Sequence, residues 1–436
     1  MTVRQKLDVI PDLLAVHAYK PDTYPYLLAS NTRGNQNSRY SMLMAHPQET
    51  LAQHTASDDC LQSITIDPCQ PESDDVLPFV GGWFIFLAYE YARSIEPTVE
   101  YFDDYSGMPI AFRSRIPAAI IVDHENETAW LVIEDDYSHL RDEIVGDINQ
   151  TGSYQPEDYA TGSIEEEDPQ IYLNHIERTK RYIHDGDIYQ ANLSRKWSVS
   201  YDDHCDPVAL FHALSRSNPA QFASLVKYQD CYVISSSPER LISLRNGMAQ
   251  SRPIAGTHPR GNTPKEDQAL SAHLLAHPKE QAEHVMLVDL VRNDLGRFCK
   301  SGTVRVTEQM VVESYEHVHH IVSNIEGEVE QGSSIADIVH AVFPGGTITG
   351  CPKVRCMEII SELEQSARGA YTGSLGYISH DGRMDLNILI RTLTYSHNNV
   401  SFRAGGGIVH DSEPDRELME TRHKARGLLN AIKAHA

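Results

Sequence analysis

The sequence predicts an α+β fold, in which helices are interspersed among antiparallel strands that turns connect. Short apolar runs bounded by turn residues indicate the strands, as at 118–122 and 128–133 on either side of the polar turn 124–126. Apolar residues at helical spacing behind an Asp or a Pro indicate the helices. Because the elements alternate without the regular spacing of strand–helix–strand units, a doubly wound sheet is disfavoured.

Helices are expected mainly in the longer C-terminal part of the chain. Asp168 supplies an N-cap, Pro169 suits the first helical position, and Gly186 ends that helix. Prolines open the later helices as well. The expected helices are 169–185, 278–295, 352–363 and 414–434.

Strands are expected between these helices. The segment 374–409 predicts a three-stranded meander with turns at 381–382 and 398–399, and it places Arg391 on a strand. Other strands are predicted from apolar runs at 231–235, 304–312 and 320–329.

A polar segment, 151–168, divides the chain. It is nearly devoid of aliphatic residues and predicts a connection or a long surface loop. The domain organisation expected from it is a strand-rich region at 1–150, packed closely against a longer region at 169–436.

The charge balance excludes several classes of partner. The chain has 436 residues, with 37 Lys and Arg against 61 Asp and Glu, which gives a formal charge of −24. Such a chain is a poor binder of nucleic acid or of anionic membrane surfaces, and no apolar stretch is long enough to span a membrane. The seven cysteines, an odd number without CxxC spacing, indicate reduced thiols in a cytoplasmic protein.

Two of the expected helices carry carboxylates on the same face as apolar residues. Glu280 and Glu283 share a face in the second helix, and Glu417, Glu420 and Lys424 share one in the last. A solvated ladder of salt bridges is the commoner outcome of such spacing. If these faces are buried instead, they offer the oxygen ligands that Mg²⁺ needs.

Two glycine-rich segments, 343–353 and 404–409, suit a ligand that lies against bare backbone. The first leads into a helix that proline initiates, and a helix N-terminus favours anions. Neither segment matches a dinucleotide or P-loop pattern. Arg391 has apolar neighbours, and an enclosed guanidinium needs an anionic partner, for which a carboxylate is the best match.

Taken together, ten motifs resemble the chorismate-utilising enzyme family, which includes the anthranilate, aminodeoxychorismate, isochorismate and salicylate synthases. The resemblance covers nearly all of the chain and is strongest after Asp168. Any one motif is modest, but the full set in this order is highly specific. The motifs are GDIYQANLSR (186–195), SSSPERL (235–241), SRPIAGTHPRG (251–261), AEHVMLVDLVRNDLGR (282–297), HHIVSNIEG (319–327), FPGGTITGCPKVRCMEII (343–360), GSLGYI (373–378), MDLNILIRT (384–392), AGGGIV (404–409) and ELMETRHKA (417–425).

The resemblance implies two stacked antiparallel β-sheets flanked by helices, with the active site in the cleft between the sheets. It also implies a Mg²⁺ cofactor with Glu283 and Glu420 as ligands, supported by Glu280 and Glu417. Glu239 would act as general acid on the C4 hydroxyl of chorismate, and His320 as an acid–base group near the ring. The residues that would hold the two substrate carboxylates are Thr347, Tyr371, Arg391, Gly405, Gly406 and Lys424.

Two positions bear on which family reaction to expect. Family members that add water to chorismate resemble one another in having a lysine at the position of Gln190. A glutamine cannot serve as a base for water. The resemblance therefore implies ammonia as the nucleophile. Ala255 stands where most aminodeoxychorismate synthases have a lysine that forms a covalent adduct, and anthranilate synthases share this alanine. The shortness of the chain, Ala29 in place of a glutamate, and the motifs at 343–350 and 384–388 favour aminodeoxychorismate synthase component I.

The resemblance then implies amination of chorismate to 4-amino-4-deoxychorismate, for p-aminobenzoate and folate biosynthesis. The route would pass through a non-covalent 2-amino-2-deoxyisochorismate intermediate, because Ala255 cannot form the adduct. A glutamine amidotransferase subunit would supply the ammonia as the partner in a heterodimer. Anthranilate synthase component I and a non-catalytic ligand-binding member remain as alternatives. Ser30 and Arg39 match the element that holds tryptophan in family members, although ordinary strand residues are the simpler interpretation.

Overall fold

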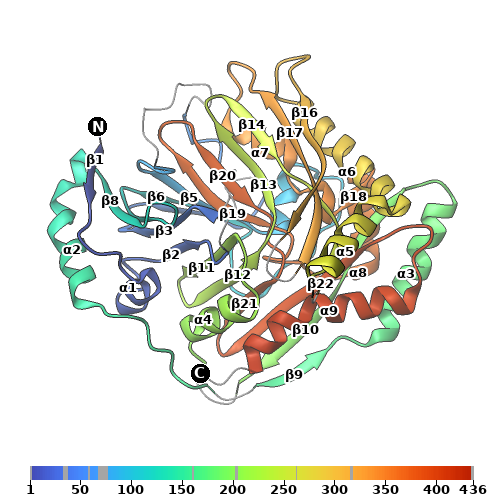
Figure 1. The fold of residues 1–436 in the computed structure, drawn as a ribbon, viewed down its shortest axis with the longest axis horizontal. Helices are drawn as coiled ribbons and strands as arrows, with labels where there is room; N and C mark the ends of the chain where they lie inside the picture. Colours follow the sequence, from blue (N-terminus) through green and yellow to red (C-terminus); the bar gives the residue numbers. More distant parts are fainter. Residues whose placement is uncertain are drawn as a thin grey trace.

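Two antiparallel β-sheets stack face to face and carry helices on their outer surfaces (Figure 1). This arrangement confirms the α+β class and the stacked sheets expected from the sequence. The computed structural model describes residues 2–32, 38–56, 59–66, 77–159, 162–201, 205–261, 263–314 and 318–433.

The first sheet contains twelve of the described strands and draws on both ends of the chain. Its order is β1-β8-β7-β3-β2-β11-β12-β21-β22-β10-β18, and β9 pairs with β10 at the side. The bounds are β1 Thr2–Lys6, β2 Tyr26–Ala29, β3 Tyr40–Ala45, β7 Ala118–Asp123, β8 Thr128–Glu134, β9 Ser163–Glu166, β10 Gln190–Ser200, β11 Phe222–Tyr228, β12 Cys231–Ser237, β18 Gly350–Cys351, β21 Thr392–Ser396 and β22 Asn399–Ile408.

The second sheet contains ten of the described strands. Its order is β15-β17-β14-β13-β20-β19-β5-β6-β4, and β16 pairs with β17. The bounds are β4 Thr50–Gln53, β5 Gly82–Leu87, β6 Ala111–Ile116, β13 Arg240–Arg245, β14 Met248–Ser251, β15 Ile254–Pro259, β16 Arg305–Ser314, β17 Val318–Glu328, β19 Ser374–Ser379 and β20 Met384–Asn387.

The helices pack on the outer faces of the two sheets. In Figure 1, α9 and α3 run along the first sheet near β10, and α6 lies beside β17 of the second. Within the described ranges, no helix is both long and apolar enough to cross a membrane. The α-helices are α1 Leu13–Tyr19, α2 Arg141–Gln150, α3 Pro169–His184, α4 Pro207–Ser217, α5 Pro264–Ala276, α6 Pro278–Gly296, α7 Ile335–Val342, α8 Lys353–Glu364 and α9 Pro414–Lys433, and the 3₁₀ helices are η2 Tyr89–Ser94, η3 Asp135–Leu140 and η4 Gly346–Ile348.

All four helices expected from the sequence form. The start of α3 shows why: the Asp168 side chain accepts a hydrogen bond from the backbone N–H of Gln170, and Pro169 follows at the first helical position. Tyr172 and Ile176 of its apolar stripe are fully buried. The last helix, α9, is described as far as Lys433, and Ala434 lies outside the described residues.

An apolar core fills the space between the sheets. It joins side chains of β2, β3 and β11 in the first sheet to those of β5, β6 and β19 in the second. The rings of Tyr26 and Phe84 stack across the sheet boundary with their centroids 4.1 Å apart, and Phe112 packs beside both. Burial of these large rings is the main force that holds the sheets together.

The prediction of a three-stranded meander at 374–409 is wrong. The segment forms two hairpins in different sheets, with β19 and β20 in the second sheet and β21 and β22 in the first. The chain crosses between the sheets at 388–391, so Arg391 precedes β21 and does not lie on a strand. Its φ of 52° departs from strand geometry. Apolar periodicity in the sequence does not reveal such a break in a strand.

A second crossover lies beside the first, where β12 of the first sheet leads through Pro238 and Glu239 into β13 of the second. The two crossovers bond to each other. The backbone N–H of Ser236 donates to the carbonyl of Arg391 at 3.1 Å, and that of Ile388 donates to the carbonyl of Glu239 at 3.0 Å. Glu239 and Arg391 are thus fixed at the boundary between the sheets.

A buried ion network ties α8 to the first sheet. The Glu364 carboxylate lies 2.7 Å from an Arg368 nitrogen and 3.0 Å from an Arg403 nitrogen, and all three side chains are almost fully buried. It also accepts a hydrogen bond from the backbone of Ser194 in β10. Arg368 in turn donates to the carbonyl of Ile348 in η4. The network therefore joins α8 and the turn after it to β10, β22 and η4.

Replacing Glu364 by Leu should lower the free energy of unfolding by about 3–5 kcal/mol, because two guanidinium groups would stay buried without their carboxylate. Urea denaturation of the variant and the wild type measures the change. The matched control is Glu362→Leu on the exposed side of α8, where the ion pair with Arg178 is partly solvated, and it should cost less than about 1 kcal/mol. Equal losses in the two variants would contradict the prediction.

Candidate functional site

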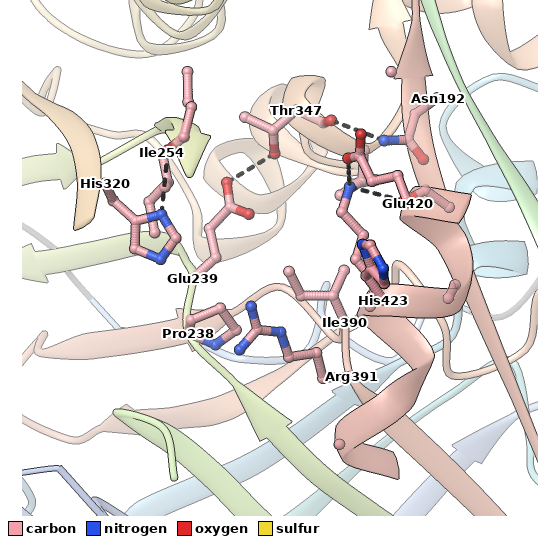
Figure 2. Close-up of a pocket in the computed structure, with 18 of the residues that line it drawn as sticks. Asn192, Pro238, Glu239, Ile254, His320, Thr347, Ile390, Arg391, Glu420 and His423 are labelled. Carbon is pink, nitrogen blue, oxygen red and sulfur yellow. Dashed lines mark hydrogen bonds and ion pairs between the residues drawn. The ribbon is translucent and has the colours of Figure 1, made fainter. Parts of the chain in front are cut away.

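A cavity of about 1070 Å³ brings most of the predicted site residues together. It is lined by β10, β15, α6, η4, β22 and α9, and by the two crossovers between the sheets. Figure 2 shows Glu239, His320 and Thr347 around one side of this space, with Arg391 below them and Glu420 on the helix opposite. The predicted residues in its lining are Gln190, Glu239, Ala255, Glu280, Glu283, His320, Thr347, Tyr371, Arg391, Gly405, Glu417, Glu420 and Lys424.

Gly406 lies between two glycines of β22 that line the cavity. A Cβ atom at this position would come within 3.6–3.8 Å of side-chain atoms of Glu417, Glu420 and Lys424. The polar face of α9 therefore lies directly over this part of β22. The Lys424 ammonium donates to the carbonyl of Gly405 at 3.0 Å and pairs with Glu420 at 2.7 Å.

Glu239 is a buried carboxyl group whose pKa is raised. Its side chain accepts a hydrogen bond of 2.8 Å from the Thr347 hydroxyl, and only 6% of the residue is exposed. Burial raises the pKa of Glu239 to about 7, although the Thr347 hydrogen bond and the charge of Lys424 act in the opposite direction. A carboxyl group with this pKa can give up or take a proton near neutral pH.

Arg391 presents a guanidinium to the same cavity. In the described part of the chain its one side-chain hydrogen bond goes to the Asn218 amide oxygen at 3.3 Å, and it forms no ion pair there. Burial lowers the pKa of Arg391, since a charged group loses solvation without a partner to compensate. An anionic ligand would supply the missing partner, as the sequence motif suggested.

His320 stands on β17 beside Glu239 (Figure 2). Burial lowers the pKa of His320 to about 4, so the ring is neutral at physiological pH. Its Nδ1 atom lies 3.3 Å from the carbonyl of Gly256 and donates a hydrogen bond to it. In a neutral ring this tautomer leaves Nε2 as the acceptor, which is the form that can take a proton.

The four predicted metal-binding glutamates face the cavity from two helices. Glu280 and Glu283 come from α6, and Glu417 and Glu420 from α9. Glu283 accepts a hydrogen bond of 3.4 Å from the amide nitrogen of Gln190. Among the described residues, no three His, Cys, Asp or Glu side chains gather closely enough to hold an ion by themselves. The four glutamates therefore form an acidic lining, with two carboxylates from α6 and two from α9.

The two candidates for a tryptophan site do not join this cavity. Arg39 pairs with Asp123 at 2.8 Å and with Glu125 at 3.2 Å. The backbone N–H of Ser30 donates to the hydroxyl of Ser41. Thr32, from the same segment, does line the cavity, but residues 33–37 lie outside the described ranges.

Sequence reasoning missed several polar residues of the cavity lining, among them Asn192, Asn218 and Arg403. Asn192 had a signal, because it follows Gln190 by two positions on a strand and must share its face. Asn218 is the C-cap of α4 and approaches Arg391 only through the tertiary fold. Arg403 is buried, and its charge is taken up by Glu364.

Comparison with known proteins gives consistent matches along the chain. The family model described as chorismate binding enzyme matches residues 24–430. The anthranilate synthase component I-like protein of Synechocystis sp. is 38% identical over 415 residues, which cover 95% of this chain and 84% of that protein. Aminodeoxychorismate synthase component 1 of Bacillus subtilis is 39% identical over 368 residues, which cover 81% and 77%. The crystal structure of anthranilate synthase component I from Streptococcus pneumoniae superposes with a TM-score of 0.80 at 29% identity, covering 91% of this chain and 93% of that one.

The pH dependence of stability should report the raised pKa of Glu239. The folded protein keeps this proton up to about pH 7, whereas the usual pKa is 4.5, so stability is lost as the pH rises between those values. Relative to Glu239→Gln, which stays neutral, the wild type should lose roughly 3 kcal/mol of unfolding free energy across this interval. Urea denaturation at several pH values measures both proteins, and parallel curves would contradict the raised pKa.

Proposed function

Because the chain belongs to the family of chorismate-binding enzymes, we propose that it aminates chorismate to 4-amino-4-deoxychorismate with ammonia as the nitrogen source. The observation that carries this proposal is that Glu239 and Arg391, one on each crossover, line the same cavity. A proton donor and a guanidinium without a carboxylate partner in the described chain face one cavity. This combination suits a dianionic substrate with a hydroxyl leaving group.

The cavity offers groups for the carboxylates of chorismate. Arg391 and Lys424 supply positive charge, while the hydroxyls of Thr347 and Tyr371 and the backbone of Gly405 supply hydrogen bonds. The Arg391 guanidinium can bind a carboxylate with two parallel hydrogen bonds. Such a partner would restore the interaction energy that Arg391 loses on burial.

Glu239 is the candidate general acid for the leaving hydroxyl. As ammonia bonds to C2, the C4–oxygen bond breaks and the ring double bonds shift. Glu239 gives its proton to the departing oxygen, which leaves as water, and the new amino group releases one proton in return. A second ammonia then bonds to C4 while the C2 nitrogen leaves as ammonia. His320, neutral and adjacent, is placed to accept or return a proton in these steps.

Direct attack by ammonia fits the residues at positions 190 and 255. Gln190 lines the cavity, and an amide cannot act as a base for water. Ala255 lies on β15 opposite Ile321, and its methyl group cannot form a covalent adduct with the substrate. Both features support an intermediate that stays unattached to the protein.

The acidic lining fits Mg²⁺ as a cofactor. Magnesium takes oxygen ligands and is commonly held by one or two carboxylates together with substrate oxygens and water. Glu283 from α6 and Glu420 from α9 would hold it, with Glu280 and Glu417 in support. The bound ion would neutralise charge on a substrate carboxylate in a protein that is itself strongly acidic.

Ammonia from glutamine would require a second chain. No amidotransferase motif occurs in this sequence, so we propose a glutamine amidotransferase subunit as partner. The segment that contains Ser30 and Arg39 is the candidate site for bound tryptophan. The buried Ser30 hydroxyl has no hydrogen-bond partner in the described residues.

Formation of anthranilate is the second candidate function, and Ala255 is the feature that favours it. In that reaction the 2-amino-2-deoxyisochorismate intermediate would lose its side chain as pyruvate. The two outcomes share the first amination and differ in whether a second ammonia reaches C4.

Product identification separates the candidates. The purified chain, given chorismate, Mg²⁺ and ammonium, should form 4-amino-4-deoxychorismate, detected by mass, without release of pyruvate. Fluorescent anthranilate together with pyruvate would establish the second candidate instead. If chorismate is not consumed at any ammonium concentration, the protein is a ligand-binding member of the family and the proposal fails.

Replacing Glu283 or Glu420 by Gln should reduce turnover at least about 100-fold with little change in stability, because a neutral amide binds Mg²⁺ weakly. Electron paramagnetic resonance with Mn²⁺ as a probe should show weakened metal binding independently of activity. Glu177→Gln, on the exposed face of α3, is the control and should change neither measurement. Normal turnover with unchanged metal dependence in both variants would refute the ligand assignment.

A further inference from the structure

Two side-chain amides project from one face of β10 into the cavity. Gln190 and Asn192 are two positions apart on this strand, so both point to the same side of the sheet. Gly407 of the adjacent strand β22 makes room for them, since a Cβ atom there would lie only 2.3 Å from the Gln190 amide nitrogen. The glycine-rich strand thus opens a recess beside the amides.

The orientation of each amide is fixed by a partner that can only accept. The nitrogen of Gln190 donates to the Glu283 carboxylate at 3.4 Å, and the nitrogen of Asn192 donates to the backbone carbonyl of Thr347 at 3.4 Å. Neither acceptor could bond to an amide oxygen. Figure 2 shows the Asn192 nitrogen turned to Thr347 and its oxygen turned away.

Both amide oxygens are therefore left with unused acceptor capacity. The Gln190 Oε1 and Asn192 Oδ1 atoms are buried and have no hydrogen-bond partner among the described residues, and Gln190 as a whole is 2% exposed. Buried polar atoms without partners are uncommon in native proteins, and at a cavity they point to a ligand that completes the bonding. That ligand must bring hydrogen-bond donors.

The surroundings restrict the ligand further. Carboxylates of the substrate can only accept hydrogen bonds, so they cannot satisfy the two amide oxygens. Ammonia carries three N–H donors and a single lone pair. Two of its N–H groups can bond to the two oxygens, which leaves the lone pair directed to a substrate in the cavity.

We propose that the side-chain oxygens of Gln190 and Asn192 form the binding site for the ammonia nucleophile. The inference rests on the proposed amination of chorismate and extends it, because it assigns a residue, Asn192, and a position for the second reactant. Gln190 and Asn192 would hold the nucleophile through hydrogen-bond acceptors, without a proton-transfer role.

The test compares ammonium dependence in variants of the full chain. Asn192→Leu, which removes the acceptor, should raise the KM for ammonium about tenfold, as expected for one lost hydrogen bond, while the KM for chorismate changes less than about twofold. Gln190→Met should act in the same way. Asn174→Leu, exposed on α3, is the matched control and should behave as wild type.

A second readout does not depend on turnover. Ammonium chloride should raise the midpoint of thermal unfolding above that in tetramethylammonium chloride at equal ionic strength, and Asn192→Leu should abolish the difference. If wild type shows the shift but does not aminate chorismate, the proposed function fails and the ammonia site stands. If the KM for ammonium is unchanged in Asn192→Leu, the Asn192 oxygen does not bind the nucleophile.

Discussion

The hydrogen bonds between the two crossovers are the constraint on which the rest of the site depends. Strands that leave one sheet and enter the other must turn at the boundary, and here two such turns lie side by side and bond to each other through Ser236, Glu239, Ile388 and Arg391. One turn carries Glu239 and the other carries Arg391. The backbone positions of these two residues are therefore held together by hydrogen bonds. The helices α6 and α9 add carboxylates to the lining of the same cavity.

The electrostatic character of the cavity differs from that of the whole chain. The protein carries a net charge of −24, and a dianion approaching it is repelled at long range. Within the cavity, Arg391 and Lys424 offset that charge locally, and the acidic residues of α6 and α9 would do so once they hold a divalent cation. Binding thus depends on a few groups placed at short range, because salt screens the field of the distant surface charges.

Sequence reasoning predicted the fold class, all four expected helices and the buried stripe of α3, because capping residues and apolar periodicity are local signals. The sequence motifs also pointed to the residues that line the cavity. Sequence reasoning could not predict the crossover at 388–391. An apolar run has the same pattern whether the strands on either side of it belong to one sheet or to two. The contact of Asn218 with Arg391 was equally hidden, because α4 and that crossover are far apart in the chain. The roles of Ser30 and Arg39 stay predictions.

The interleaving of the two ends of the chain has a consequence for biosynthesis. In the second sheet β5 pairs with β19, so Leu87 must wait for Ser374 to be synthesised. In the first sheet the late strands β21 and β22 lie between β12 and β10. One edge of β2 and one edge of β5 are therefore made long before β11 and β19, the strands that pair with them. Such long-range pairing slows folding and leaves strand edges exposed during translation. In a nascent chain these two edges are open to pairing with strands of other molecules until the C-terminal strands emerge.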